Sequence, residues 1–258
     1  MPAATELLGR LAQKAAAQPP APGSGRFDYV KAQAWYLDSA VAGGRTTSAL
    51  VPTLTETWTA PDGSGRMITI TGHAEVERIG NRETLKAVTF GGGRRETVVF
   101  GQAGTERIPL VDFEHLSTDP TVLVRQLTTA GGTDDWVERA QKIRDLYRQQ
   151  VIPPRLQGAL LRVLATTPGL VTLGRGHDRV GREVVAVGLE SAAHGRPARY
   201  AFLFDPRTGA FVGYEETMTT LLVNPQTGRD YLNVRIPAVV DYQAYLAAGH
   251  APDTATRP

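Results

Sequence analysis

Five histidines are the first side chains in this chain that could hold a metal ion or move a proton. No two of them have the H-x-x-H or H-E-x-x-H spacing of a helical metal pair, and the chain has no cysteine to add thiolate ligands. A zinc site needs three or four such ligands in one place. The sequence therefore predicts no metal site among His73, His115, His177, His194 and His250.

Serine and glycine motifs also give no catalytic or cofactor signal. The G-S-G of residues 63–65 is the nearest approach to a nucleophile elbow, but it lies in an expected hairpin loop. The glycines of residues 174–181 lack dinucleotide-binding spacing, and a strand follows them where a phosphate site needs a helix N-terminus. We expect no catalytic residue, no cofactor and no enzymatic activity.

Glu56 is the charged residue with the most informative position. Along the alternating segment 53–59, Leu54, Glu56 and Trp58 share the side expected to face the core, while the threonines between them are expected to face water. A carboxylate on the core side must be paired, protonated, or exposed at the mouth of a cavity. A pair with Arg66 beside Trp58 is the simpler interpretation, and a polar contact lining a ligand cavity is the other.

Large aromatic residues supply the remaining site candidates. They could line an apolar pocket between a sheet and the helices that cover it, although aromatic side chains at such spacings also form ordinary core. With the polar pair above, the candidate ligand-cavity residues are Glu56, Trp58, Arg66, Trp136, Phe202, Phe204 and Phe211.

Composition limits the class of protein that these residues belong to. The 258 residues carry a formal charge of +2, with acidic and basic residues interspersed, so the sequence does not predict a nucleic-acid-binding surface. No window holds 18 uninterrupted apolar residues, so no segment is expected to span a membrane. We expect an amphipathic helix and a Pro/Gly linker at 1–25, one sheet domain at 26–246, and a tail at 247–258.

The clearest element among those that would position the candidates is a hairpin at Arg199–Glu216. Its turn, D-P-R-T-G, has a proline that presets the second position and a glycine that accepts a left-handed conformation. If Asp205 pairs with Ala210, Phe204 faces Phe211, and Tyr214 lies on the opposite side of the sheet from them. Both sides are largely apolar, so both are expected to be covered.

The other elements follow from the period of the apolar residues. Residues 43–48 are expected to form a loop, and the period changes from two to about 3.6 after Ser117. Strands are predicted at 27–37, 53–59, 66–71, 84–90, 96–100, 170–173, 182–189, both arms of the hairpin and 231–240, and helices at 120–127, 134–149 and from Pro153 to a stop at Pro168.

The order of sheet, helices, sheet predicts the fold class. Three helices between two sets of strands favour an α+β fold in which one large antiparallel sheet curves around them as a half-barrel. About three helices would then lie on its concave side. The apolar stripes of those helices would face the concave surface.

Four segments in series resemble one known family. They are Glu56–Arg66, Ser117–Pro120, Ile143–Gly169 and Phe204–Gly213, and the likeness extends over Phe27–Thr217. They are similar to actinobacterial membrane-anchored proteins encoded beside extracytoplasmic-function sigma factors. The domain is also similar to the lipoprotein-carrier architecture of LolA and RseB.

This resemblance implies a non-enzymatic extracytoplasmic domain, held at the membrane by a transmembrane anchor outside this sequence. Its partners would be a lipid-like ligand or a regulatory protein, with no nucleic acid. Two alternatives stay open: a lipid or lipoprotein carrier, and a hydrolase whose unrecognised site includes Glu56, Asp178 or a histidine. Neither the ligand nor the oligomeric state follows from the sequence.

Overall fold

The computed structural model describes residues 3–75, 92–102, 105–108, 110, 115–128, 136–192, 197–223, 226, 228 and 230–258. Within these residues it has nine strands and four helices. The strands are β1 (Phe27–Ala42), β2 (Arg45–Thr59), β3 (Gly65–Thr71), β4 (Arg94–Phe100), β5 (Val171–His177), β6 (Glu183–Ser191), β7 (Ala198–Phe204), β8 (Phe211–Met218) and β9 (Ala238–Ala251). The helices are α1 (Ala4–Ala16), α2 (Pro120–Leu127), α3 (Trp136–Gln149) and α4 (Pro154–Ala165).

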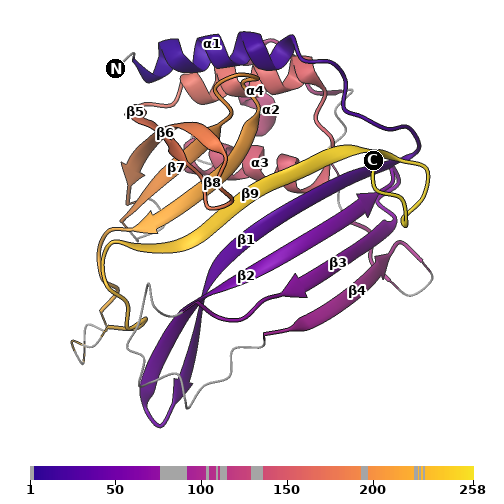
Figure 1. Cartoon of the computed structure of the whole chain (residues 1–258). Coiled ribbons are helices and arrows are strands. Elements are labelled where there is room, and N and C mark those ends of the chain that lie inside the picture. Colours follow the sequence, from indigo (N-terminus) through magenta and orange to yellow (C-terminus); the bar gives the residue numbers. More distant parts are fainter. Residues whose placement is uncertain are drawn as a thin grey trace.

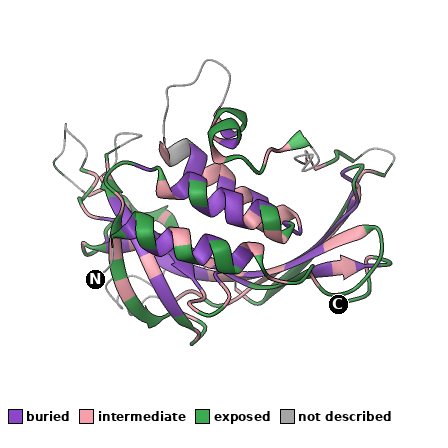
Figure 2. Cartoon of the chain, turned by 90° about the horizontal axis from the view of Figure 1, so that it is seen from above, coloured by how far each residue is buried: buried purple, intermediate pink, exposed green. Residues whose placement is uncertain are grey.

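All nine strands belong to one antiparallel sheet with the order β4-β3-β2-β1-β9-β8-β7-β6-β5 (Figure 1). Register shifts interrupt four of its strand pairs, β1 with β9, β5 with β6, β7 with β8, and β8 with β9. Because a bulge bends its strand and increases the local twist, these shifts help to curl the sheet. The helices lie inside the curve (Figure 2), so the predicted α+β class with helices on the concave side is confirmed.

The fourth helix on this side is α1, in addition to the three that the sequence places between the strands. Its apolar stripe buries Leu8, Leu11 and Ala12 in a core shared with α4 and the strands β6 to β8. A Cβ on Gly209 would lie 2.1 Å from the backbone oxygen of Leu11, so the turn between β7 and β8 touches α1 directly. None of the four described helices combines the length and hydropathy needed to cross a bilayer.

The β7–β8 hairpin contains a bulge, and beyond it the strand pairing differs from the prediction. Phe204 pairs with Phe211 as expected, and the Asp205 amide donates to the Ala210 carbonyl at 2.9 Å. The register then shifts by one residue, so Phe202 pairs with Tyr214 and not with Gly213. Tyr214 therefore joins the aromatic cluster under the helices, and its predicted place on the opposite side was wrong.

The two faces of β2 are also reversed relative to the prediction. Trp58 pairs with Tyr29, whereas Thr57 pairs with Val30. Residues of even number in β1 face the helices, since Ala32 belongs to the core under α1. Thr57 is therefore on the helix side and is buried, while Trp58 lies on what we call the outer face, the side of the sheet away from the helices. The expectation that the threonine row faces water was wrong for Thr57 and Thr59, which are buried, while Thr53 and Thr55 are partly exposed.

Several predicted bounds shift. The segment 43–48 is not a loop, because a turn at 43–44 joins β1 directly to β2. The last strand is at Ala238–Ala251 and not at 231–240, so it includes the first five residues of the expected tail. The predicted helix at 120–127 is confirmed as α2, and the Asp119 carboxylate caps it by accepting from the amide of Thr121 at 2.8 Å. The predicted strand at 84–90 and the start of α3 at 134–135 lie outside the described residues.

Candidate functional site

A cavity of about 300 Å³ lies where the linker after α1, the junction of α3 with α4, and the strands β8 and β9 meet. We call it the linker cavity. The linker side is formed by Pro19, Ala21 and Pro22, and the helix junction contributes Val151 and Ile152. Prolines fix an extended linker there, and the Pro153-Pro154 pair ends one helix and starts the next. The sequence thus places irregular backbone on both sides of this space.

Three aromatic rings form the wall between helix and sheet. Tyr147 of α3 meets Phe211 of β8 with ring centroids 4.9 Å apart, and Tyr245 of β9 lies 5.8 Å from Tyr147 and 5.5 Å from Phe211. Burial raises the pKa of the Tyr147 hydroxyl, which has no hydrogen-bond partner among the described residues. The hydroxyl oxygen is itself buried, so Tyr147 contributes its aromatic ring and not a polar atom to the wall.

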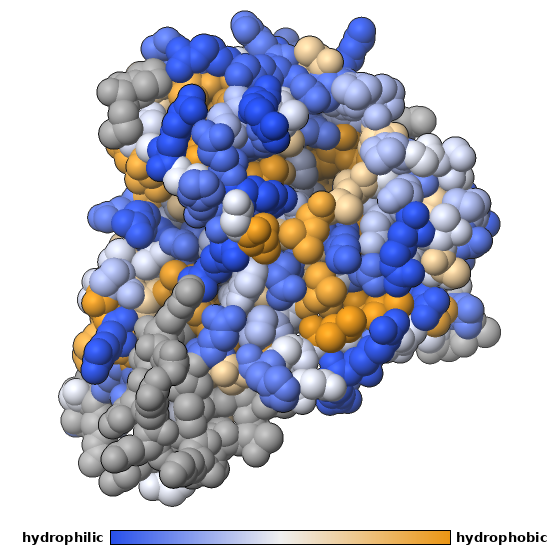
Figure 3. Space-filling model, in the orientation of Figure 1, coloured by the Kyte–Doolittle hydropathy of each residue, from blue (hydrophilic) through white to orange (hydrophobic). Residues whose placement is uncertain are grey.

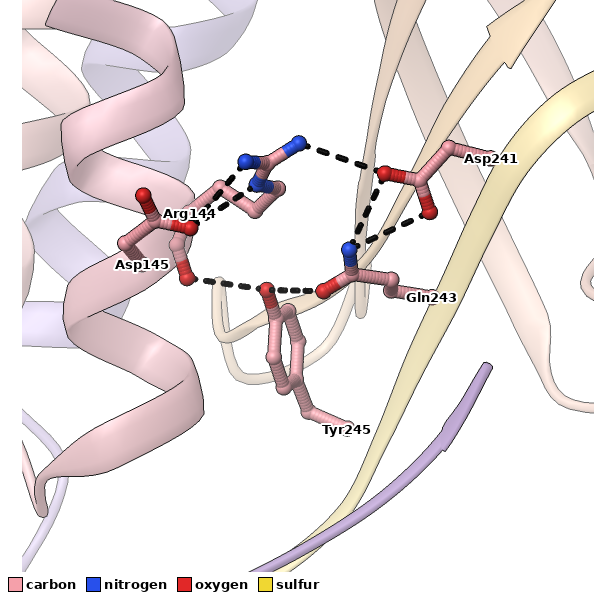
Figure 4. Close-up of polar contacts among 5 residues, drawn as sticks. All are labelled: Arg144, Asp145, Asp241, Gln243 and Tyr245. Carbon is pink, nitrogen blue, oxygen red and sulfur yellow. Dashed lines mark hydrogen bonds and ion pairs between the residues drawn. The ribbon is translucent and has the colours of Figure 1, made fainter. Parts of the chain in front are cut away.

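A polar network behind this wall holds Tyr245 in place (Figure 4). The Tyr245 hydroxyl donates to the Arg144 carbonyl of α3 at 3.0 Å. The Arg144 guanidinium bonds Asp241 of β9 at 3.2 Å, and the Gln243 amide bonds both oxygens of Asp241 at 3.1 Å. These contacts join α3 to β9 and fix the ring that borders the cavity.

The charges in this network are almost fully removed from solvent. The Arg144 and Asp241 side chains are 15% and 16% exposed. Burial raises the pKa of Asp241, although Gln243 and Arg144 oppose that shift. Burial tends to lower the pKa of Arg144, but the carboxylates of Asp145 and Asp241 raise it overall. The pair can remain ionised because each charge has a partner. Removal of Arg144 would leave the Asp241 carboxylate buried without a cation, whereas Arg144 also pairs with Asp145 at 3.1 Å.

Arg182 is the one charged side chain among the described residues that line the linker cavity. Its guanidinium bonds the Asp178 carboxylate at 2.7 Å, the Tyr245 carbonyl at 2.5 Å and the Val212 carbonyl at 2.9 Å. Its charge is paired with Asp178 and three of its five N–H donors already have acceptors, so the cavity does not require a charged ligand. The arrangement is suited to holding an apolar molecule with few polar atoms.

Of the predicted aromatic candidates, one borders this cavity. Phe211 is part of the wall. Phe202 and Phe204 are buried in the core under α1, and Trp136 packs on that core with its ring 5.8 Å from Tyr200. Phe202, Phe204 and Trp136 therefore support the sheet–helix layer around the cavity.

The other three candidates lie together on the outer face. Glu56 and Trp58 are buried there under residues 252–258, and the Arg66 guanidinium reaches the Thr254 carbonyl at 3.4 Å. The expected pair of Glu56 with Arg66 was wrong, because Glu56 bonds Arg257 at 2.7 and 2.8 Å. Pairing in β2 and β3 sets Arg66 opposite Trp58, whereas Arg257 folds back over the Trp58 ring.

Residues 252–258 of the same chain cover this outer cluster. The Trp58 indole donates to the Thr256 carbonyl at 2.7 Å, and Glu56 accepts from the Tyr29 hydroxyl at 2.8 Å. Figure 3 shows this face, where apolar side chains gather over β2 and β3. Neighbouring apolar positions there are Leu54 and Ile70, which pair directly.

The residues named for a hydrolase do not meet in one place. Asp178 closes its own turn by accepting from the amides of Val180 and Arg182, and Glu56 lies on the outer face. His250 contacts Asp28 at 3.1 Å, and His194 lies outside the described residues. Among the described residues, no three His, Asp or Glu side chains could hold a metal ion. The absence of catalytic, metal and cofactor sites stays a prediction.

Sequence reasoning missed Tyr147 and Tyr245 as cavity residues. Tyr147 falls within the helix predicted at 134–149, but no local pattern shows that its ring borders a cavity. Tyr245 falls outside the strand predicted at 231–240. The proline run of the linker was the available signal, because a stretch that cannot form a helix or strand often borders a gap in packing.

No protein-family model matches the chain, and no curated protein matches it by sequence. Among solved structures it is similar to one described as an outer membrane lipoprotein-sorting protein domain from Vibrio parahaemolyticus, with 12% identity, 95% of this chain and 92% of that chain covered, and a TM-score of 0.22. It is also similar to a DUF1329 family protein from Desulfovibrio piger, with 11% identity, 96% and 91% covered, and a TM-score of 0.19. At these TM-scores neither structure carries an argument about this chain.

Proposed function

We propose that this domain binds one apolar, lipid-like molecule in the linker cavity and catalyses no reaction. The observation that carries the proposal is the cavity between helices and sheet, with three aromatic rings in its wall. Small-molecule sites are typically concave, mostly apolar and furnished with a few polar groups. A volume of about 300 Å³ is at the lower end of the usual range, which fits a single chain better than a two-chain lipid.

The setting in which such binding would act is also part of the proposal. The four segments that resemble sigma-factor-associated proteins favour an extracytoplasmic domain of a membrane-anchored regulator with a LolA/RseB-like architecture. Ligand binding would then shift an equilibrium between two states of the regulator, by as much as its affinities for those states differ. A protein partner or a carrier role would be the alternative use of the same domain.

Native mass spectrometry of the chain expressed in bacteria tests the binding directly. We expect a retained mass in the lipid range, or uptake of added decan-1-ol if the cavity was emptied during purification. Ala248→Trp should abolish both, because Ala248 borders the cavity and pairs with Val30, which also lines it. Directly paired strand residues point to the same face, so the indole would occupy the cavity.

Val41→Trp is the matched control, since Val41 is 73% exposed near the tip of the β1–β2 hairpin and should not affect binding. A chain that retains no mass and takes up no decan-1-ol would contradict the proposal and favour a protein partner. Ligand that exchanges rapidly onto vesicles would favour a carrier over a sensor.

A further inference from the structure

A second cavity, of about 480 Å³, lies between α1 and the strands β5 and β6. We call it the α1 pocket. It shares no lining residue with the linker cavity. Its apolar floor is formed by Leu7 and Leu11 of α1 and by Val185 of β6, all three of them buried. Leu7 and Leu11 are one helical turn apart, so they present a continuous apolar strip to the sheet.

Three basic side chains line the pocket beside this apolar floor. Arg10 and Lys14 follow the leucines on the same side of α1, and Arg175 of β5 lines the pocket from the sheet. None of the described residues that line it is acidic. Leu7, Arg10, Leu11 and Lys14 have the i, i+3, i+4, i+7 spacing of one helix face, so apolar and basic side chains alternate along it.

The contacts that the cations already make do not neutralise the pocket. Arg10 pairs with Glu6, and Arg175 pairs with Glu183 at 3.2 Å, but all four side chains are half or more exposed. Exposed ion pairs contribute about 0–1 kcal/mol, so a bound anion can displace them or share their cations. Lys14 donates to the carbonyl of Pro206 at 2.6 Å, which leaves two of its three ammonium protons for a ligand.

A bulge interrupts the pairing of β5 with β6 where these strands line the pocket. The register of β5 with β6 shifts between Thr172 and Gly174, and Gly174 has φ 109°, which side-chain-bearing residues rarely adopt. After the shift Arg175 pairs with Val185, so its side chain shares the face of the sheet on which Val185 forms part of the apolar floor.

We propose that the α1 pocket binds an anionic amphiphile, with its phosphate or carboxylate head among Arg10, Lys14 and Arg175 and its chain on the apolar floor. An anion gains charge-assisted hydrogen bonds from the three cations, and a chain removes the leucine strip from water. Neither part of the pocket alone would select such a ligand. This goes beyond the proposed function, whose cavity is lined by no unsatisfied charge.

Isothermal titration calorimetry with decyl phosphate, below its micellar concentration, tests the inference on the whole chain. We expect saturable binding that the double variant Arg10→Gln/Lys14→Gln weakens about tenfold or more, since each lost charge-assisted bond is worth about 1.5 kcal/mol or more. Arg175→Gln, on the facing strand, should weaken it in the same direction. It provides a second test if the double variant alters α1.

Arg94→Gln is the matched control, because Arg94 also pairs with a nearby acid, Glu96, but lies on β4 at the opposite edge of the sheet. It should bind decyl phosphate as the unchanged chain does, and so should Ala248→Trp. Inorganic phosphate and decan-1-ol should each bind this pocket at least tenfold more weakly. The inference would be overturned if inorganic phosphate bound as tightly as decyl phosphate, or if decan-1-ol did so and was displaced by decyl phosphate. It would also be overturned if both cation variants bound decyl phosphate as tightly as the unchanged chain.

Discussion

Glu56 is the residue whose surroundings explain most about the outer face. A carboxylate that is almost fully buried is accepted there because it bonds Arg257 twice and Tyr29 once. The bonds from Arg257 and Tyr29 lower the pKa of Glu56 to about 2, against the opposing effect of burial. The contact joins residues 201 positions apart in the chain, so it ties residues 252–258 to the sheet.

Replacing this carboxylate gives a test with a defined pH dependence. The folded pKa of Glu56 is lowered from 4.5, so the stabilisation is complete above pH 4.5 and is lost as the pH falls toward about 2. Glu56→Gln should lower the free energy of unfolding by about 2 kcal/mol at pH 7. It should also flatten the loss of stability between pH 4.5 and 2, as measured by urea midpoints.

Glu96→Gln is the control for that series, because Glu96 lies in an exposed pair on β4 whose contribution is small. Its urea midpoint should change little at pH 7. If Glu56→Gln and Glu96→Gln gave the same midpoints at every pH, the paired state of Glu56 would be refuted.

At the scale of elements, the close packing of α1 on α4 depends on one glycine. Gly158 is buried inside α4, where glycine costs about 1 kcal/mol of helix stability relative to alanine. A Cβ at this position would lie 2.7 Å from the Ala12 oxygen and 2.8 Å from the Ala16 Cβ. The cost in helix propensity is offset by the close approach of the two helices.

Two glycine substitutions should therefore have opposite signs. Gly158→Ala is expected to destabilise the chain by about 2 kcal/mol, because α1 must move away. Gly9→Ala in α1 should stabilise it by about 1 kcal/mol, since a Cβ there meets nothing within 4 Å. Thermal unfolding of both variants checks this, and a stabilising Gly158→Ala would show that α1 does not pack as described.

The tie between α3 and β9 gives a second prediction at this scale. Arg144→Met should destabilise the chain by about 3 kcal/mol, because it leaves the Asp241 carboxylate buried without its cation. Adding Asp241→Leu should restore a large part of that loss, since the buried charge is then gone. Additive losses in this double-mutant cycle, measured by urea unfolding, would contradict a coupled pair.

The sequence identified most elements but not the faces they present. Helix caps, proline stops and the Asp205–Gly209 turn act through neighbouring residues, so α2, α4 and the β7–β8 hairpin were found from local patterns. The face of Tyr214 depends on a bulge, and the cover of Trp58 depends on residues 252–258, which are distant in sequence. Such long-range contacts have no local pattern, and this is why Arg257, Tyr147 and Tyr245 were missed.

At the scale of the whole molecule, one curved sheet separates two kinds of surface. Its concave side carries four helices and encloses the linker cavity and the α1 pocket, while its outer face is partly closed by residues 252–258 (Figures 1 and 2). The domain bounds expected from the sequence stay a prediction, although the structure packs both the N-terminal helix and the C-terminal residues onto the sheet. The α1 pocket is lined in part by α1 and the linker cavity in part by the linker that follows it, so both depend on the N-terminal segment.

The linker cavity is the central claim, and methyl-labelled NMR with decan-1-ol tests it most directly. The account predicts that the methyl signals of Val30, Val151 and Ile152 shift with added decan-1-ol and saturate together, while those of Val98 and Val99 on β4 remain in place. Unchanged Val30, Val151 and Ile152 signals at saturating decan-1-ol, or shifts confined to β4, would contradict it.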